Sequence, residues 1–530
     1  MAIHEHKIYD YYIVAENGYF YNPETRKMMD DHPSSVSPKP QVINTNLIKT
    51  CKIAAAEMKG LALERNEVIF HAMCSVNDGD GCLDLNSRAG RFKSLLKCRQ
   101  IQRIRMLVCT ASLLTTDDYA RLAQEYPDFA FWFDGPLRRA IRGRTDGLNM
   151  DSTNDCIDSL FSSGDFDRAL QLALELAKAR NPLTFARLAV NTFGDEYPER
   201  LRVSYEPRRG NLFSEGSLCT LFEWKPEPWR IPSHEELTSI EALLSMKAVR
   251  GMETFYSAHN TKWYFSATSV AIQYLETLNP KVRMVLRNIV IREDFKSVSN
   301  PELHARGLIP FCRENANLRI TQHVSLFESM LPSSSGGQDN RRSFYYDRDS
   351  VWGPECLEAM INLIQVAFSL QTLGMPNESF SLVFDNSVTE GDWVWNTIVM
   401  RTAALQEVFT RWLRARSIIL RTNEGREPGG YGRLWDVPST FAANVRSIAE
   451  GNAIMQLTAR MSSVEIKATD LDLNSRMHYT FGDWDDEWNA GVGYLEWNTD
   501  FWRRLHPKYS IEPAGFKRVV TTVRRPVGGP

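Results

Sequence analysis

Residues that could do chemistry occur along the whole chain, but their spacing matches no common catalytic motif. The ten histidines form no HExxH zinc pair, and the chain has no GxSxG serine elbow. Distant residues can meet in a fold, so a Cys–His nucleophile pair stays open, with His304 and Cys312 sharing one stretch. A core cysteine and a loop histidine are the favoured interpretation, and the catalytic residues of any enzyme remain unknown.

Two glycine-containing segments partly resemble ligand-binding loops, but each lacks residues that such a loop requires. The DGDG segment at 78–81 would need oxygen ligands at the first and twelfth positions of an EF-hand loop, where the chain has Val76 and Ser87. The GREPGGYG segment at 425–432 is not followed by the GK[ST] of a phosphate-binding loop. We interpret both as loops and expect no metal, no cofactor and no small-molecule ligand.

Aromatic and acidic residues gather near the C-terminus, in residues 478–506. Trp484 and Trp488 lie among four acids between 483 and 487. Carboxylates beside tryptophan are typical of a sugar cleft, in which two acids divide the general acid and base roles. Such carboxylates usually come from separate elements, so we favour a docked aromatic segment. An enzyme site in this segment is the alternative.

Two clusters of cations could bind phosphates. The cations are Arg91, Lys93, Lys97, Arg99, Arg103 and Arg105 in residues 91–105, and Arg138, Arg139, Arg142 and Arg144 in residues 138–144. Lys and Arg on one helix face can neutralise a nucleic-acid backbone, but the solvated face of an ordinary helix has the same pattern. Nearby acids favour the solvated face. The first cluster with Arg138, Arg139, Trp484 and Trp488 is our candidate interaction surface.

Composition describes an ordinary globular chain. The 530 residues are 43% hydrophobic and 24% charged, with a net charge of −3 that indicates no particular partner. The opening MAIHEHKIYD does not resemble a secretory signal, and the chain has no apolar run long enough to span a membrane. The nine cysteines include no CxxC pair, which favours reduced thiols. We expect a cytoplasmic or nuclear protein, or both, with no membrane partner.

The elements that would position any site centre on residues 253–331. Aromatic residues at Thr261–Phe265 predict a strand, and Ser266 or Thr268 is a plausible cap for the helix that follows. Pro280 suits the start of a second helix. The alternation in Asn288–Arg292 predicts another strand, with Arg292 and Glu293 outside.

Upstream, the sequence predicts further helix–strand units. A helix over residues 47–58 leads to a strand at Val68–Phe70. Strands at Arg105–Ala111 and Phe129–Phe133, separated by a helix, give a βαβ-like pattern without a glycine-rich loop. Asn17-Gly18 is typical of a hairpin turn between two aromatic strands.

Two of these stretches carry a resemblance. The segments FYSAHNTKWYF and NPKVRMVLRNIVIRED within 253–293, and NLIKTCKIAAAEMKGLALERNEVIF at 46–70, are similar to elements of a group of uncharacterised ascomycete fungal F-box-like proteins. The resemblance implies an adaptor-type interaction protein. The N-terminus shows no clear leucine–proline opening of an F-box, so a role in a ubiquitin ligase is not implied.

We therefore expect a soluble, helix-rich α/β or α+β protein built from helix–strand units with a mixed sheet, or alternatively an irregular leucine-rich-repeat-like α/β fold. The expected domains are 1–200, 201–331 and 344–513, followed by a basic, disordered tail at 514–530. The leading hypothesis is a non-catalytic intracellular protein with an unidentified protein partner. The alternatives are an enzyme with a C-terminal site and a nucleic-acid binder that uses the basic clusters.

Overall fold

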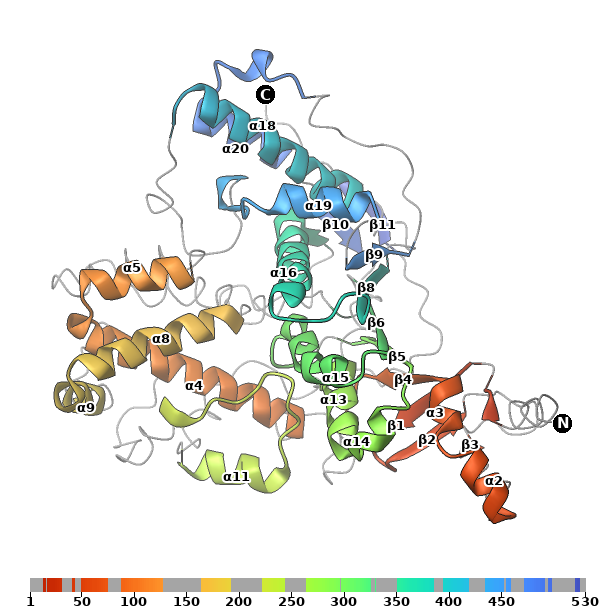
Figure 1. Ribbon diagram of the computed structural model, residues 1–530. Coiled ribbons are helices and arrows are strands. Elements are labelled where there is room, and N and C mark those ends of the chain that lie inside the picture. Colours follow the sequence, from red (N-terminus) through yellow and green to blue (C-terminus); the bar gives the residue numbers. More distant parts are fainter. Residues whose placement is uncertain are drawn as a thin grey trace.

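The fold is seen in a computed structural model (Figure 1). The structure describes residues 13–15, 17–30, 41–42, 49–74, 87–126, 164–191, 222–243, 264–295, 297–325, 329, 350–385, 394–418, 434–451, 454–458, 471–490, 494–497 and 520–524. The expected DGDG and GREPGGYG loops, the strand at Phe129–Phe133 and Arg138 and Arg139 lie outside these residues.

The centre of the fold is an eight-stranded sheet in the order β3-β2-β1-β4-β5-β6-β8-β9. The strands are β1 (Tyr19–Asn22), β2 (Lys27–Asp30), β3 (Gln41–Val42), β4 (Glu67–His71), β5 (Asn288–Arg292), β6 (Arg319–Ser325), β8 (Phe380–Asp385) and β9 (Met455–Leu457). From β1 through β9 every neighbouring pair is parallel, whereas β2 and β3 add to β1 as antiparallel strands. The mixed sheet expected from the sequence is confirmed.

The helices account for most of the remaining structure. They are α2 (Lys52–Glu57), α3 (Leu61–Arg65), α4 (Arg88–Thr110), α5 (Thr116–Glu125), α8 (Gly164–Arg180), α9 (Pro182–Asn191), α11 (His234–Leu243), α13 (Ala267–Thr277), α14 (Pro280–Arg283), α15 (Ile309–Glu314), α16 (Gly353–Thr372), α18 (Arg401–Ala415), α19 (Phe441–Ala449) and α20 (Phe481–Ala490). Shorter helical turns are η2 (Ala111–Leu113), η7 (Pro301–Leu308), η11 (Val394–Met400), η12 (Leu434–Asp436) and η13 (Asn474–Arg476).

The order of the parallel strands explains where the helices lie. Each new strand is added on the same side of the previous one, so the direction of winding never reverses. Crossovers between parallel strands are right-handed, and crossovers that all advance in one direction place their helices on one face of the sheet. Accordingly α13, η7, α16 and α19, which come from successive crossovers, all contribute to one hydrophobic core.

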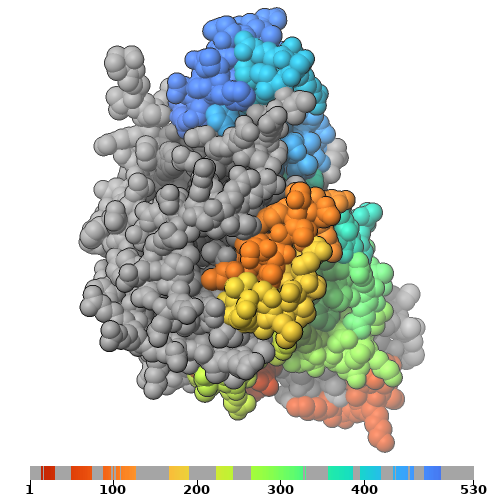
Figure 2. Space-filling model, turned by 90° about the vertical axis from the view of Figure 1, so that its left-hand side faces the viewer, coloured from red at the N-terminus to blue at the C-terminus, as the bar shows by residue number. Residues whose placement is uncertain are grey.

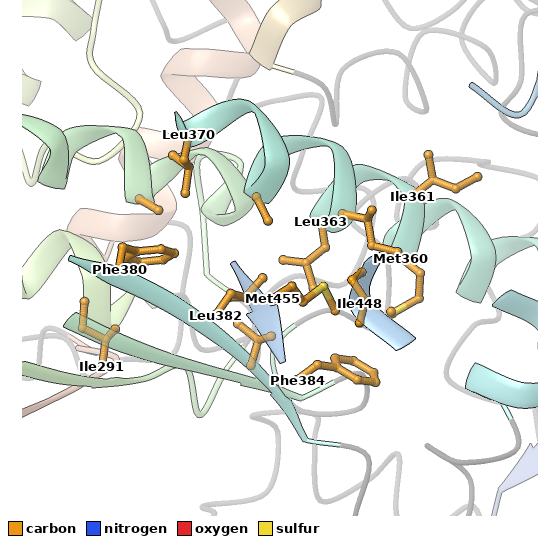
Figure 3. Packing of buried hydrophobic residues seen from close by; sticks show 14 of the residues in the cluster. Ile291, Met360, Ile361, Leu363, Leu370, Phe380, Leu382, Phe384, Ile448 and Met455 are labelled. Atoms are coloured by element: carbon orange, nitrogen blue, oxygen red, sulfur yellow. The ribbon is translucent and has the colours of Figure 1, made fainter. Parts of the chain in front are cut away.

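Strand alternation sends one set of side chains into that core. The set comprises Val68, Phe70, Ile289, Ile291, Ile320, Val324, Phe380, Leu382, Phe384 and Met455. Figure 3 shows Leu363 and Leu370 of α16 directed toward Phe380 and Leu382 of β8. Successive residues of a strand point to opposite faces, so the residues between these core positions belong to the other face.

A second core is formed by helices alone. Leu107 of α4, Leu122 of α5, Leu170 and Leu174 of α8 and Phe185 of α9 are buried against one another. Figure 2 shows these helices, orange and yellow, side by side on one face of the molecule. Residues 105–111, expected to form a strand, belong to this bundle as the end of α4 and the start of η2. The prediction was wrong because residues 106–109 are a short continuous apolar run, and such a run fits a buried helix as well as a buried strand.

The first turn of α13 is held by a buried carboxylate. Ser266 caps the helix by accepting from Ser269 N, as the sequence predicts. Glu293, directly after β5, accepts from Ala267 N at 2.9 Å and from Thr268 Oγ1 at 2.7 Å. Gln322 of β6 donates to the same carboxylate at 3.2 Å. The expectation that Glu293 lies outside was wrong, because a negative charge at a helix N-terminus satisfies N–H groups that would otherwise be buried without partners.

A histidine completes this buried polar cluster. His304 Nδ1 lies 2.6 Å from Ser266 Oγ, and its Nε2 lies 2.7 Å from the carbonyl oxygen of Ser299. The carbonyl is an acceptor, so Nε2 carries the proton and Nδ1 accepts from the serine hydroxyl. Burial lowers the pKa of His304 to about 4, outweighing the bond to Ser299.

Several expectations about organisation are corrected. The sheet joins strands from all three expected domains, and one hydrophobic core contains residues from each of them. The structure describes a hairpin between β1 and β2, with its turn between Asn22 and Lys27, whereas most of the strand expected before Asn17-Gly18 lies outside the described residues. In the expected disordered tail, β11 (Val520–Arg524) pairs with β10 (Tyr494–Trp497), which pairs with β7 (Ser350–Trp352). Cys51, Cys109, Cys312 and Cys356 are free thiols, as expected, whereas Cys74 is disulfide-bonded.

The buried imidazole makes stability depend on pH. Between pH 6.5 and 4 the unfolded chain binds a proton at His304 and the folded chain does not, so stability falls as the pH is lowered through this window. The shift corresponds to roughly 3 kcal/mol. Urea unfolding of the wild type and of His304→Gln between pH 6.5 and 4 measures this contribution to the free energy of unfolding. The variant should lose that part of the pH dependence, and an equal dependence in both proteins would contradict the assignment.

Candidate functional site

The structure places three arginines of the candidate interaction surface inside the protein. Arg91 is 9% exposed and donates through Nε to Glu241 of α11 at 2.8 Å. Arg99 and Arg103 are 3% and 0% exposed. Both donate to Asp167 of α8, at 2.8 and 2.6 Å. The expectation of exposed side chains is therefore wrong for these three, because their charges join α4 to α8 and α11.

Asp167 is the centre of this ionic contact. Burial would raise the pKa of its carboxyl, but the charges of Arg103 and Arg99 and their hydrogen bonds hold the pKa below its usual value. Burial has the larger effect on Arg103, which pairs with Asp167. It lowers the pKa of Arg103 to about 10, although the charge of Asp167 acts in the opposite direction. A charged side chain can be buried when an opposite charge lies beside it. The arginines of α4 are therefore explained by contacts inside the protein.

The other residues of the first cluster are placed less fully. Lys93 is half-buried on α4. Lys97 and Arg105 belong to the same helix, and their side chains lie outside the described part of the structure, as do Arg138 and Arg139. Among the described residues, the cations of the two clusters therefore do not form an exposed patch.

The two tryptophans of the candidate surface are also buried. Trp484 and Trp488 are both 0% exposed on α20. Trp484 packs edge-on against Phe409 and Trp412 of α18, and Trp488 Nε1 donates to Thr402 Oγ1 at 3.2 Å. This matches the interpretation of a docked aromatic segment and removes these tryptophans from the expected surface.

Two of the carboxylates beside these tryptophans, Asp483 and Glu487, have structural partners. Asp483 accepts from the backbone N–H of Thr480 at 2.7 Å, and Thr480 Oγ1 accepts from Asp483 N, so the two residues together cap the start of α20. Glu487 accepts hydrogen bonds from Nε and Nη2 of Arg476, at 2.9 and 2.6 Å. These two carboxylates are therefore held by structural contacts and are not free to divide the acid and base roles of a glycosidase.

The possible Cys–His pair is not supported. His304 is occupied by Ser266 and Ser299, as described above. Cys312 is fully buried, and burial raises the pKa of its thiol to about 11, although Ser379 and Arg319 oppose the change. A nucleophilic cysteine must form a thiolate and be reached by substrate, and Cys312 meets neither condition.

The strongest candidate site is the sheet face opposite the helix-covered core, which we call the outer face. It comprises Glu67, Ile69 and His71 of β4, Asn288, Val290 and Arg292 of β5, Arg319, Thr321 and His323 of β6, Ser381, Val383 and Asp385 of β8, and Gln456 of β9. Their alternation with core residues and their strand pairing place them on one side. Ile69 and Val290, although buried, are not part of the core.

Polar residues line both ends of the outer face. At the amino ends of the strands, Glu67, Asn288 and Arg319 are in register and exposed. At the carboxyl ends, His71, Arg292 and His323 are in register across three neighbouring strands, and we call them the carboxyl row. Figure 1 shows these strands side by side at the centre of the molecule.

The carboxyl row has a defined geometry. His71 Nδ1 lies 2.5 Å from Oδ2 of Asp294, two residues beyond the end of β5 on the neighbouring strand. This bond orients the ring and leaves Nε2 without a partner among the described residues. Arg292 is exposed and forms no ion pair within the described part of the chain. Burial and the charge of Arg292 lower the pKa of His323, while Asp385 and Glu67 act in the opposite direction.

Sequence reasoning identified part of this face. The alternation in Asn288–Arg292 predicted that Val290 faces away from Ile289 and Ile291, and the structure confirms it. The neighbours of β5 were missed, because pairing with β4 and β6 brings together residues far apart in sequence. Within the described ranges, no group of His, Cys, Asp or Glu side chains could hold a metal ion. Nor is any described helix long and apolar enough to cross a membrane.

Comparison with known proteins adds no assignment. No family model, no curated protein and no solved structure matches this chain.

The buried ionic contact predicts a large loss of stability on removing one charge. Asp167→Asn leaves two buried guanidinium groups without their counterion. We expect a cost of about 2–4 kcal/mol, toward the lower part of the range for buried pairs because solvent reaches Asp167. Urea unfolding measures the cost. The matched control, Glu125→Gln, breaks the exposed Arg121–Glu125 pair within α5 and should change nothing measurable. Equal stability of the two variants would contradict the argument.

Proposed function

We propose that this protein is a non-catalytic interaction protein that binds a protein partner through the outer face of its sheet, in the cytoplasm or nucleus. The observation that carries the proposal is the one-sided arrangement of the helices. Successive parallel strands in chain order leave the outer face lined by residues from five strands. Repeat proteins with helices on one side use such extended surfaces for binding.

The same arrangement argues against a common kind of enzyme. In open parallel sheets, ligands bind in the crevice where the strand order reverses and helices change faces. Among the described strands from β1 to β9 the order does not reverse, so this part of the sheet has no such switch point. The outer face instead has exposed polar residues at its edges and half-buried residues such as Val383 between them, while Ile69 and Val290 are buried.

The two segments that carry the fungal resemblance support the proposal by forming one unit. Residues 46–70 contribute β4 and residues 253–293 contribute β5, and these strands pair along their full length. Gly60, with φ of +81°, lies against Val285, and Arg287 pairs with Glu64 at 3.6 Å. Segments distant in sequence thus build the centre of the proposed surface. The adaptor role that the resemblance implies remains part of the proposal.

Site-specific photo-crosslinking tests the surface. A benzoylphenylalanine placed at Asn288 or at Gln456, exposed positions on two strands of the outer face, should capture the same protein from the cells that make this chain. The control position is Leu183 on α9, which is 86% exposed and belongs to the helical bundle. It should not capture that protein.

The outcomes separate the competing functions. A Skp1-like adaptor captured from the outer face would support the adaptor form of the proposal. A product removed by nuclease would favour the nucleic-acid alternative. The proposal is overturned if Asn288, Gln456 and Leu183 give the same products, or if neither outer-face position gives any.

A further inference from the structure

We propose that the amino edge of the sheet, the surface at which β5 and β6 begin, binds a segment of the partner protein that carries both acidic and apolar side chains. The inference rests on the proposed function, because the amino edge borders the outer face at Arg319, and it adds the chemistry of the partner. Two segments form the centre of the edge, residues 279–288 before β5 and residues 311–319 before β6. Their cations are Lys281, Arg283, Arg287, Arg313 and Arg319, and their one acid is Glu314.

Side-chain contacts join the ends of three helices into one surface at this edge. Glu314, the last residue of α15, accepts from Nε of Arg283 in α14 at 2.6 Å. Arg313 donates to the carbonyl oxygens of Leu373 and Gly374, just beyond α16, at 3.1 and 2.8 Å. Each of these helices leads into a strand, so the surface lies where β5, β6 and β8 begin.

Much of the positive charge at the edge has no carboxylate beside it. Arg287 and Arg319 each donate through Nη1 to two backbone carbonyl oxygens of the turn that precedes their strand. A carbonyl carries only a partial negative charge, so a guanidinium bound in this way keeps most of its own charge. Lys281, Arg313 and Arg319 are exposed and form no ion pair within the described part of the chain.

The neighbouring segments do not cancel this charge. Residues 59–67 before β4 and residues 373–380 before β8 add Lys59 and Arg65, and Glu64, Glu67 and Glu378. The four segments together therefore carry seven cations and four acids. The opposite end of the outer face differs, because there Arg292 lies among Asp294 and Asp385. The balance of charge thus attracts an acidic ligand to the amino edge and not to the carboxyl row.

Two exposed apolar side chains favour a peptide over a nucleic acid at this edge. Met284, between Arg283 and Arg287 in sequence, is 44% exposed. Leu373, whose carbonyl oxygen accepts from Arg313, is 40% exposed. A phosphate backbone gains nothing from such contacts, whereas a polypeptide can place apolar residues on them and acids on the surrounding cations.

Fluorescence anisotropy of a labelled random copolymer of glutamate and tyrosine, bound to the full chain, tests the edge. Lys281→Glu and Arg319→Glu should each weaken binding about tenfold or more, because each replaces an attractive charge by a repulsive one. The matched control is Arg292→Glu, on the same face but about 13 Å away along the strands. In about 0.1 M salt this exceeds the Debye length of about 10 Å, so the control should weaken binding less than about threefold. Circular dichroism and urea unfolding show that the variants are folded.

Poly-L-glutamate separates the apolar contribution from the charge. It should bind more weakly than the copolymer, because it has no side chain to bury against the apolar residues of the edge. Met284→Ser should weaken binding of the copolymer and leave binding of poly-L-glutamate unchanged.

Each other outcome overturns the inference. Equal losses in Arg319→Glu and Arg292→Glu would mean a general charge effect, and no binding by the wild type would mean that the edge is not an acid-binding surface. Equal binding of the two polymers would remove the apolar contribution. Equally tight, Arg319-dependent binding of single-stranded DNA would assign the edge to nucleic acid. If the outer face captures a protein but the copolymer does not bind, only this inference fails. If the copolymer binds and no protein is captured, the proposed function fails.

Discussion

The buried carboxylate of Glu293 joins the elements on which the centre of the fold depends. It follows β5, accepts from the first backbone N–H groups of α13, and receives the side chain of Gln322 from β6. Burial raises the pKa of Glu293, although each of these hydrogen bonds opposes the change. A group buried at this cost requires all its partners in place, so it fixes the helix and both strands relative to one another. His304 extends the same network to η7 through Ser266.

With β5 and β6 fixed in this way, the remaining architecture follows from chirality. Strands are added in one direction, and right-handed crossovers place their helices on one face. The segments that connect these parallel strands differ greatly in length. The one-sided arrangement of the helices gives an outer face built by five strands. Residues as far apart in sequence as Glu67 and Gln456 lie on this face.

Buried arginines of α4 hold the helical part of the protein together. Arg91, Arg99 and Arg103 are eight and four residues apart on α4, and all three are buried against acids or polar groups of other helices. In sequence this pattern resembles a nucleic-acid helix, because the spacing of cations is the same whether they face phosphates or carboxylates. Asp167 is what distinguishes the two cases, and it lies 64 residues from Arg103 in the chain.

The sequence by itself determined the local elements of this protein: the cap of α13 at Ser266, the break at Pro280, and strands β4 and β5 with their inward and outward residues. These depend on propensity, capping and periodicity, which act over a few residues. Only the tertiary structure decided that Glu293 is buried, that Trp484 and Trp488 are core residues, and that His71, Arg292 and His323 form one row. Those outcomes depend on strand pairing and on counterions supplied by distant segments, and the spacing of residues within one segment carries no information about either.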